Sequence, residues 1–336
     1  MAAEITSMQS VSTINATFIR PSMFYISGFQ NIPHAKYYYM FLCFAYAVTV
    51  LGNSFIMGII YLARTLHTAK YIAVFNLALS DLCGSSALIP KLVDMFLFEN
   101  QYISYEACLA NMFFVFVFMA LDSLSLVALA YDRLVAICFP LRYHAIVTKA
   151  TMTLIIGVMW VFSVTIFAVT VTLITKLSFC RSTTVDSYFC DHGPIHRLAC
   201  NDNSINIIMG VICIAVLIFI PMIFITLSYF FIGFALFKMS HGVERNKATK
   251  TCTAHLILVA ICYLPISSIY IAAYIIPISS NVRIFNTALT QTIPPMLNPI
   301  IYTIKTEEVM QSLKAVYRRT KVNSVMEKSI KNAVRN

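Results

Sequence analysis

The stretch NSINIIMGVICIAVLIFIPMIFITLSYFFIGFALF (residues 203–237) contains no Lys, Arg, Asp or Glu. As a helix rising about 1.5 Å per residue, it exceeds the roughly 20 residues needed to cross ~30 Å of hydrocarbon. Six further runs share this character, and only Asp81 and Asp122 interrupt them. They cover residues 38–63, 71–90, 108–131, 150–175, 251–282 and 284–304. The sequence therefore predicts seven membrane spans.

The composition supports the same conclusion. Of the 336 residues, 59% are apolar and only 11% are charged, whereas a soluble domain carries about 25% charged residues. Lipid cannot hydrogen-bond to a free backbone amide, and continuous apolar runs exclude the alternating pattern of a membrane β-barrel. We predict an all-α membrane protein, a seven-transmembrane helix bundle over residues 38–304, with a short cytosolic amphipathic helix after the seventh span.

The basic residues predict the orientation of the bundle. Most of the 24 Lys and Arg fall in the first, third and fifth loops and in the tail, residues 305–336. The positive-inside rule makes that side cytosolic and places the N-terminal region, residues 1–37, outside the cell. That region shows no removable signal peptide, so the first span is expected to act as a signal anchor. Its Asn15 begins an Asn-Ala-Thr glycosylation sequon.

The net charge of +10 is explained largely by this asymmetry. We therefore expect no nucleic-acid partner, and expect the basic tail to lie along anionic membrane lipid.

Four cysteines fall in predicted extracellular segments, where disulfides form readily. They are Cys108, Cys180, Cys190 and Cys200. Four cysteines allow three pairings, and their spacing alone does not choose among them.

Two acids inside the spans require an explanation, because a carboxylate at mid-bilayer costs at least about 2.5 kcal/mol. Asp81 and Asp122 are predicted near the middle or inner half of the membrane. One interpretation is a shared site for a sodium ion, with Asn53 and Asn298 as neutral oxygen donors. The alternative is that one acid is protonated and hydrogen-bonded between helices. No other cofactor is expected.

At the inner end of the third span, Asp132 and Arg133 lie beside Tyr143. The guanidinium is suited to holding a neighbouring helix or a docking partner, although for an isolated pair an ordinary membrane boundary is the favoured explanation. His255 lies near the inner end of the sixth span, as a titrating group or a neutral hydrogen-bond partner. The fifth, sixth and seventh spans are interrupted by prolines that bend helices: Pro221, Pro265 and Pro299.

No arrangement of residues indicates an enzyme. The chain shows no phosphate-binding glycine loop, no His and Cys at metal-ligand spacing beside an acid, and no internal repeat typical of a transporter.

Several motifs nevertheless occur in a recognisable order along the chain. They include GN (52–53), LH (66–67), LALSDL (77–82), PK (90–91), LAYDRLVAIC (129–138), PLRY (140–143), KATKTCTAH (247–255) and PPMLNPIIY (294–302). Together they resemble the odorant receptors, a branch of the rhodopsin-like (class A) G protein-coupled receptors. Leu134, Asp122 and the pair Ala69-Lys70 depart from the usual family pattern, which indicates a divergent, fish-type branch.

The resemblance implies a function and several residue roles. It implies disulfides Cys108–Cys190 and Cys180–Cys200, and activation of a stimulatory, olfactory-type G protein that raises cyclic AMP. It also implies a plasma-membrane receptor of the cilia of olfactory sensory neurons. The expected residues for G-protein coupling and switching are Asp132, Arg133, Tyr143, Tyr229, His255, Asn298, Pro299 and Tyr302.

In this architecture a ligand binds between the outer halves of the helices, so we sought inward-facing residues at helical spacing. The candidates are Phe116, Met119, Ala120, Ser123, Gly210, Cys213, Leu217, Tyr263, Ser267, Tyr270 and Gln291. They describe an apolar slot with a few hydroxyls and one amide, suited to a small neutral or weakly polar odorant. Capture of an anion at the rim by Lys91 and Arg283, beside His192 and His196, is the alternative to a solvated outer face.

Two other functions are compatible with the residues. A receptor for an internal lipid or steroid cue outside the nose would share the same motifs. A channel or transporter would use Asp81 and Asp122 as an ion path, but would not need the cytosolic docking motifs.

Overall fold

The computed structural model describes residues 19–29, 35–180, 182–239, 242–276, 278–305 and 309–311. Asn15 lies outside the described residues, as does most of the basic tail with its expected amphipathic helix.

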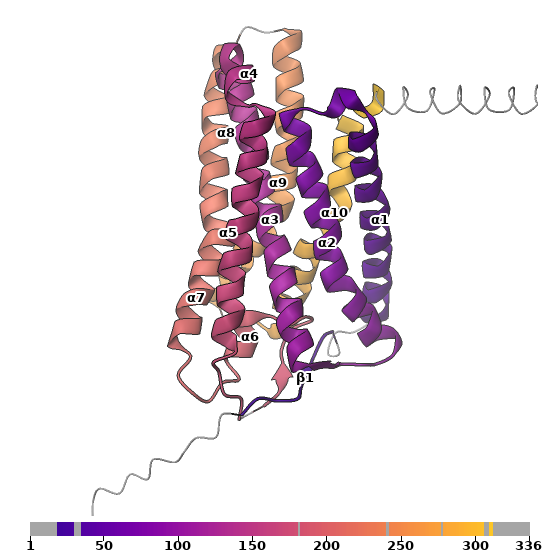
Figure 1. Ribbon diagram of the computed structural model, residues 1–336, viewed down its shortest axis with the longest axis vertical. Coiled ribbons are helices and arrows are strands. Elements are labelled where there is room, and N and C mark those ends of the chain that lie inside the picture. The colour runs from indigo at the N-terminus through magenta and orange to yellow at the C-terminus, as the bar shows by residue number, and fades with distance from the viewer. Residues whose placement is uncertain are drawn as a thin grey trace, which may run out of the picture.

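In the described residues, seven long helices form the bundle (Figure 1). They are α1 (Ala35–Leu62), α2 (Ala69–Leu97), α3 (Tyr105–Cys138), α5 (Lys149–Ile174), the continuous α7 (Ser204–Ile214), η3 (Ala215–Phe219) and α8 (Ile220–Lys238), α9 (Val243–Ile275) and α10 (Ser280–Lys305). In the part of the chain described, six of these helices are long and apolar enough to cross a membrane. The more polar α10 is the seventh helix, and the predicted seven-helix class is confirmed.

Short elements cap the two ends of the bundle. One end, at the bottom of Figure 1, carries β1 (Met23–Ile26), β2 (Tyr102–Ser104), β3 (Thr184–Val185) and α6 (His192–His196). We call it the lid end. The opposite end carries η1 (Arg64–Leu66), η2 (Pro140–Arg142) and α4 (Tyr143–Ile146), and we call it the α4 end.

The helix ends differ from the ends of the charge-free runs. Helices α2 and α3 continue past their runs into charged residues, and these charges are paired: Lys91 with Asp94 on α2, and Arg133 with Asp132 on α3. The sixth run, 251–282, extends too far, because α9 ends at Ile275 and α10 begins at Ser280. Ile276 is extended (φ −138°, ψ 147°), as expected for a residue that precedes a proline in the sequence.

The lid-end sheet has the strand order β2-β1-β3. Strand β1 pairs antiparallel with β2 and parallel with β3. Its inward side chains, Phe24 and Ile26, are fully buried. Part of the N-terminal region is therefore a packed component of the lid end.

A polar cross-link ties three helices in the interior. The Trp160 indole of α5 donates to Asn76 Oδ1 of α2 at 2.8 Å, and the Asn76 amide donates to Ser125 Oγ of α3 at 2.9 Å. Asn76 and Ser125 are buried, and inside a low-dielectric core such satisfied bonds specify one arrangement of neighbours. Around them a continuous apolar cluster fills the space between the helices.

Prolines inside the helices leave backbone carbonyls without their usual i+4 donor. Pro221 cannot donate to the carbonyl of Leu217, and the chain there forms the π-helical turn η3. The hydroxyl of Ser123 on α3 donates to that carbonyl at 2.8 Å. Pro299 likewise leaves the carbonyl of Pro295, which accepts from Asn53 Nδ2 of α1 at 3.0 Å.

Helix α1 meets α10 at the same proline. A Cβ added to Gly52 would lie 2.6 Å from Pro299 Cγ, so only glycine permits this approach. The contact places Asn53, the next residue of α1, within reach of the carbonyl of Pro295.

We predict that Gly52→Ala destabilises the bundle by about 1–3 kcal/mol, because α1 and α10 must separate to admit the methyl group. Thermal unfolding of the purified receptor measures the effect. Gly58→Ala on the same helix is the matched control, because a Cβ at Gly58 has nothing within 4 Å. Equal losses in the two variants would contradict the close packing of α1 on Pro299.

Candidate ligand-binding and signalling site

A cavity of about 600 Å³ lies inside the bundle and reaches from α6 at the lid end down to Asp81 and Asp122. Its walls come from α2, α3, α5, α7, η3, α9 and α10. We call its lid-end boundary, formed by α6 and the residues beside it, the ceiling, and the opposite end, at Asp81 and Asp122, the floor; in Figure 1 the ceiling is therefore at the bottom. The volume is within the range of sites that enclose a small organic molecule.

Eight of the candidate pocket residues line this cavity. They are Phe116, Met119, Ser123, Gly210, Cys213, Leu217, Tyr263 and Gln291. The resulting wall is mainly apolar and aromatic, with Phe167 and Phe189 beside Phe116.

Two candidates do not line the cavity among the described residues. Ala120 is buried in the apolar cluster between helices, because its short side chain on the edge of the α3 stripe does not reach inward. Ser267 faces α8, where its hydroxyl lies 3.8 Å from Met222 Sδ. The side chain of Tyr270 lies outside the described residues.

The stripe of α9 that faces the cavity is apolar, apart from Tyr263. It consists of Cys262, Tyr263, Ile266 and Ile269. The hydroxyl-bearing stripe predicted from the sequence, Tyr263, Ser267 and Tyr270, is phased on a neighbouring face of the helix. The i, i+4, i+7 spacing of Cys262, Ile266 and Ile269 is the signal that could have found it.

A hydrogen-bond chain connects three helices at the cavity wall. The Tyr263 hydroxyl of α9 donates to Ser123 Oγ of α3 at 2.6 Å, and Ser123 donates to the carbonyl of Leu217 at 2.8 Å. Both side chains are buried. Because Pro221 creates the acceptor at Leu217, this chain joins α9 and α3 to the distorted turn of the fifth span.

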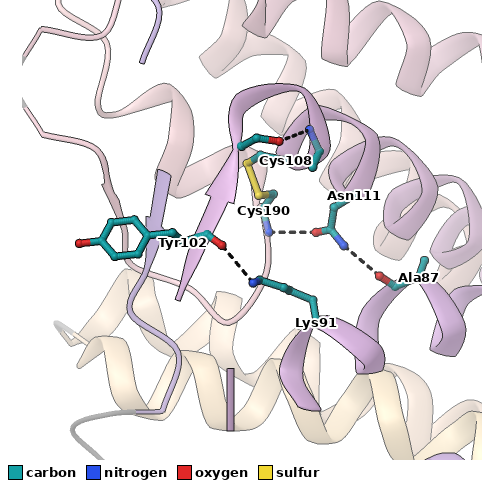
Figure 2. The surroundings of a disulfide bond; sticks show 8 residues. Ala87, Lys91, Tyr102, Cys108, Asn111 and Cys190 are labelled. Carbon is teal, nitrogen blue, oxygen red and sulfur yellow. Dashed lines mark hydrogen bonds between the residues drawn. A yellow bond between two sulfur atoms is a disulfide. The ribbon is translucent and has the colours of Figure 1, made fainter. Parts of the chain in front are cut away.

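We call the connection between α5 and α7, which contains β3 and α6, the lid. It is fastened to α3 by a disulfide. The structure contains the bonds Cys108–Cys190 and Cys180–Cys200, the two pairs that the family resemblance implies. Figure 2 shows how Asn111 of α3 adds to the first of them. Its Nδ2 donates to the carbonyl of Ala87 at 2.9 Å, and its Oδ1 accepts from the backbone amide of Cys190 at 3.2 Å. The sequence analysis did not single out Asn111.

Lys91 does not line the cavity. Its ammonium group donates to Asp94 at 2.7 Å and to the carbonyl of Asn100 at 2.9 Å. It also donates to the carbonyl of Tyr102 at 3.0 Å (Figure 2). Asp94 neutralises the charge of Lys91, and all three bonds hold the α2–β2 connection. These contacts do not favour the alternative in which Lys91 captures an anion at the rim.

Non-covalent contacts fasten the lid to α10. The Tyr188 hydroxyl donates to Gln291 Oε1 at 2.6 Å, and Gln291 Nε2 donates to Met119 Sδ at 3.1 Å. Arg283 donates to the carbonyl of Asp186 at 2.8 Å and lies 3.8 Å from an Asp191 carboxylate oxygen. Gln291 and Arg283 are thus shared between the lid and the cavity wall.

The ceiling carries two histidines whose rings lie 5.2 Å apart, His192 and His196. Burial and the neighbouring His196 lower the pKa of His192 from 6.5 to about 4, and burial also lowers the pKa of His196. Burial raises the pKa of Asp191, while Arg283 opposes that rise. The His192 ring lies 3.6 Å from where a Cβ of Gly210 would be, so Gly210 provides space for the ceiling as well as for the cavity.

Two carboxylates lie at the cavity floor. Asp81 accepts from Asn298 Nδ2 at 2.8 Å. One oxygen each of Asp81, Asp122 and Asn298 is buried without a hydrogen bond. Asn53, in contrast, uses Nδ2 for the carbonyls of Thr49 and Pro295. No cluster of three or more His, Cys, Asp or Glu that could hold a metal occurs among the described residues.

The switch candidates gather at the α4 end. Asp132 is buried, forms an ion pair with Arg133, and accepts from the Tyr143 hydroxyl of α4 at 2.7 Å. The Tyr229 hydroxyl lies 2.7 Å from His255 Nδ1, with the two rings stacked. Asn298 and Pro299 lie deeper, at the contacts with Asp81 and Gly52. The side chain of Tyr302 lies outside the described residues.

Seven membrane helices around a lidded cavity, with a buried acid–arginine pair at the far end, define a seven-helix membrane receptor. Comparison with known proteins specifies the family. A family model described as olfactory receptor matches residues 42–319.

Individual relatives agree. The chain is 33% identical over 305 residues to Olfactory receptor 1E16 of Mus musculus, covering 90% of this chain and 96% of that one. It is 35% identical over 283 residues to Olfactory receptor 1M1 of Mus musculus (83% and 89% covered). It is 33% identical over 310 residues to Olfactory receptor 52K1 of Homo sapiens (91% and 98% covered).

The chain belongs to the olfactory receptor family. It is therefore an odorant-sensing G protein-coupled receptor and a multi-pass protein of the plasma membrane, and not an enzyme. The family resemblance inferred from the sequence motifs is confirmed.

We predict that acidification weakens the lid through His192. The pKa of His192 is about 4 when folded and 6.5 when unfolded, so the unfolded state binds the proton more tightly. The contribution of neutral His192 to the free energy of unfolding is fully present above the pKa of the unfolded state and is lost as the pH falls toward the pKa of the folded state. At about pH 5 the loss amounts to about 2 kcal/mol. Thermal unfolding at about pH 7 and about pH 5 measures the difference, which His192→Gln should reduce.

The exposed His144 provides the control. His144→Gln should keep the wild-type pH dependence, and Asp191, which acts in the opposite direction, remains in both variants. A wild-type response to acid in His192→Gln would show that other groups carry it.

Proposed function

We propose that the receptor binds a small neutral or weakly polar odorant in the cavity and activates a stimulatory, olfactory-type G protein, which raises cyclic AMP. The observation that carries this proposal is the mainly apolar cavity of about 600 Å³, which is lined by Tyr263 and Ser123 of the hydroxyl chain.

The wall offers few free donors to a ligand. The hydroxyls of Thr170, Thr287 and Thr290 each donate to a carbonyl of their own helix at 2.8 Å. Val115 and Phe116 occupy the lid half of α3, where an acid would be needed to hold an amine. Recognition in this part of the cavity therefore depends on shape and apolar burial, worth about 25 cal/mol per Å².

Apart from Asp81, Asp122 and Asn298 at the floor, the polar part of the cavity is its ceiling. His192, His196, Asn203 and Arg283 line that region. A weakly polar odorant accordingly binds with its head group toward the lid and its hydrocarbon part toward Tyr263. The neutral form of His192 can donate or accept one hydrogen bond according to its tautomer.

Through the hydrogen-bond chain from Tyr263 to Leu217, a bound ligand can affect the α4 end of the bundle. An odorant in van der Waals contact with Tyr263 displaces this side chain from the position in which its hydroxyl bonds to Ser123. Helix α9 also contains Pro265, whose kink provides a pivot. Movement of Tyr263 then shifts the α4 end of α9, where His255 pairs with Tyr229.

The ligand activates the receptor because it binds one of two arrangements of the helices more tightly than the other. At the α4 end, Asp132 and Tyr143 hold the region of Arg133 in the present arrangement. An outward shift of α9 exposes Arg133 to the G protein. A ligand of modest differential affinity produces a graded response.

The basic loops support an orientation with the lid end outside the cell. This orientation gives odorants access to the lid and G proteins access to Arg133. We place the receptor in the cilia of olfactory sensory neurons, consistent with its family.

We predict that Tyr263→Phe changes odorant-driven cyclic AMP at constant surface expression, because it removes the bond to Ser123 and keeps the ring. The measurement screens neutral and acidic odorants in cells that express an olfactory-type G protein. Ser267→Ala is the matched control, because that hydroxyl faces Met222. Arg133→Ala should abolish the response, and full signalling by that variant would disprove coupling through Arg133. Responses restricted to acidic odorants would disprove the neutral-ligand proposal.

We also propose a sodium ion at the cavity floor. Its support is the set of three buried oxygens without hydrogen bonds, on Asp81, Asp122 and Asn298. Two carboxylates beside an amide oxygen are hard oxygen donors, the kind that alkali and alkaline-earth ions prefer. An ion there would favour the arrangement that holds the third and seventh spans together.

Sodium binding predicts a higher unfolding temperature in sodium chloride than in choline chloride at equal ionic strength. Asp122→Asn should abolish the difference, because it removes one negative charge and keeps the shape. An equal effect of sodium in wild type and Asp122→Asn would contradict the site.

A further inference from the structure

A buried segment of the N-terminal region packs against the lid. We call residues 23–29 the N-terminal segment; it contains β1 and lies before residue 42, where the family match begins. It runs along the lid, with the amides of Ser27 and Gly28 donating to the carbonyls of Val185 and Ser187, each at 3.0 Å. The sequence analysis treated it only as part of an extracellular region.

The segment ends in an aromatic anchor. Phe29 is 1% exposed, and its ring stacks on Tyr188 with centroids 5.7 Å apart and meets the edge of Tyr39 at 5.5 Å. Gly28, directly before it, has a φ of +56°, and a Cβ there would lie 2.7 Å from Met95 Cε. A glycine at this turn therefore allows Phe29 to enter between the lid and the helices.

The anchor acts on the cavity through Tyr188. The Tyr188 hydroxyl donates to Gln291 Oε1 at 2.6 Å, and Gln291 lines the cavity and donates to Met119. A continuous chain of contacts thus runs from Phe29 to Tyr188, to Gln291 and to the cavity wall. In contrast with the α3 side, where a disulfide holds the lid, every link on this side is non-covalent.

We propose that Phe29 is a positioning residue of the ligand cavity: it holds Tyr188 against Gln291, and so controls how readily the lid separates from α10 to admit a ligand. The proposal rests on the proposed ligand cavity. It assigns the N-terminal segment to the ligand-binding machinery.

The same segment contains a matched comparison. Phe24 is also fully buried, but it packs against Tyr105 and Phe179, on the part of the lid near the disulfides. If the segment were only a stabilising cap, loss of either phenylalanine would loosen the lid equally. If it acts through Tyr188, only the loss of Phe29 opens the cavity.

The test measures access to the cavity without any odorant or G protein. Cys213 is a free cysteine on the cavity wall, and a charged methanethiosulfonate reagent modifies its thiol only after entering. Peptide mapping by mass spectrometry gives the rate at Cys213 in purified receptor. The variants are Phe29→Ala, Phe24→Ala, Tyr188→Phe and the double variant Phe29→Ala with Tyr188→Phe.

We expect Phe29→Ala to speed modification of Cys213 on the order of tenfold, since a ring stack and its burial are lost. Tyr188→Phe, which keeps the ring, should also speed it, and Phe24→Ala should change it little. The double variant should be no faster than Phe29→Ala alone, because both changes break one path.

Equal acceleration by Phe24→Ala and Phe29→Ala, additive effects in the double variant, or no acceleration by Tyr188→Phe would each overturn the proposal. These readouts do not involve signalling. A receptor that opens as predicted but gives no odorant response would refute the proposed function and leave this inference standing.

Discussion

A helix in lipid must satisfy every backbone carbonyl from within the protein, and the prolines of this chain make that requirement the constraint on which the bundle depends. Pro221 and Pro299 each remove one donor, and each freed carbonyl is met by a side chain from another helix: Ser123 for Leu217, and Asn53 for Pro295. These bonds fix the neighbours of the fifth and seventh spans. The bond from Ser123 to the Leu217 carbonyl also positions Ser123 to accept from the Tyr263 hydroxyl. The same serine therefore satisfies the carbonyl freed by Pro221 and links α3 to α9 at the cavity wall.

The lid shows a corresponding asymmetry. On the α3 side it is held by the Cys108–Cys190 disulfide and by Asn111. On the α10 side it is held by the Tyr188–Gln291 bond and by the contacts of Arg283. The two sides therefore differ in the kind of bond that holds them. The lid over the cavity has a covalent attachment to α3 and non-covalent attachments to α10.

Much of this was predictable from the sequence, because helix positions depend on long runs without charge, and the motifs from Asp81 to Pro299 specify a family. The helix ends were less predictable, as the extended Ile276 shows. Pocket prediction succeeded where a stripe was phased on Phe116 and Met119, and failed at Ser267, where a hydroxyl was preferred to the apolar spacing of Cys262 and Ile266. Residues such as Asn111 and Phe29 could not be found, because their partners are distant in the chain and loops carry no periodicity that would align them.

The central claim is that a ligand beside Tyr263 moves the α4 end of α9 away from α3. Its most direct test is a spin-label distance between Phe139→Cys and Thr249→Cys, at exposed positions near the α4 ends of these helices, in receptor whose accessible native cysteines are replaced. An odorant that raises cyclic AMP should shift the distance distribution to longer values. An odorant that signals fully and leaves the distribution unchanged would contradict the account.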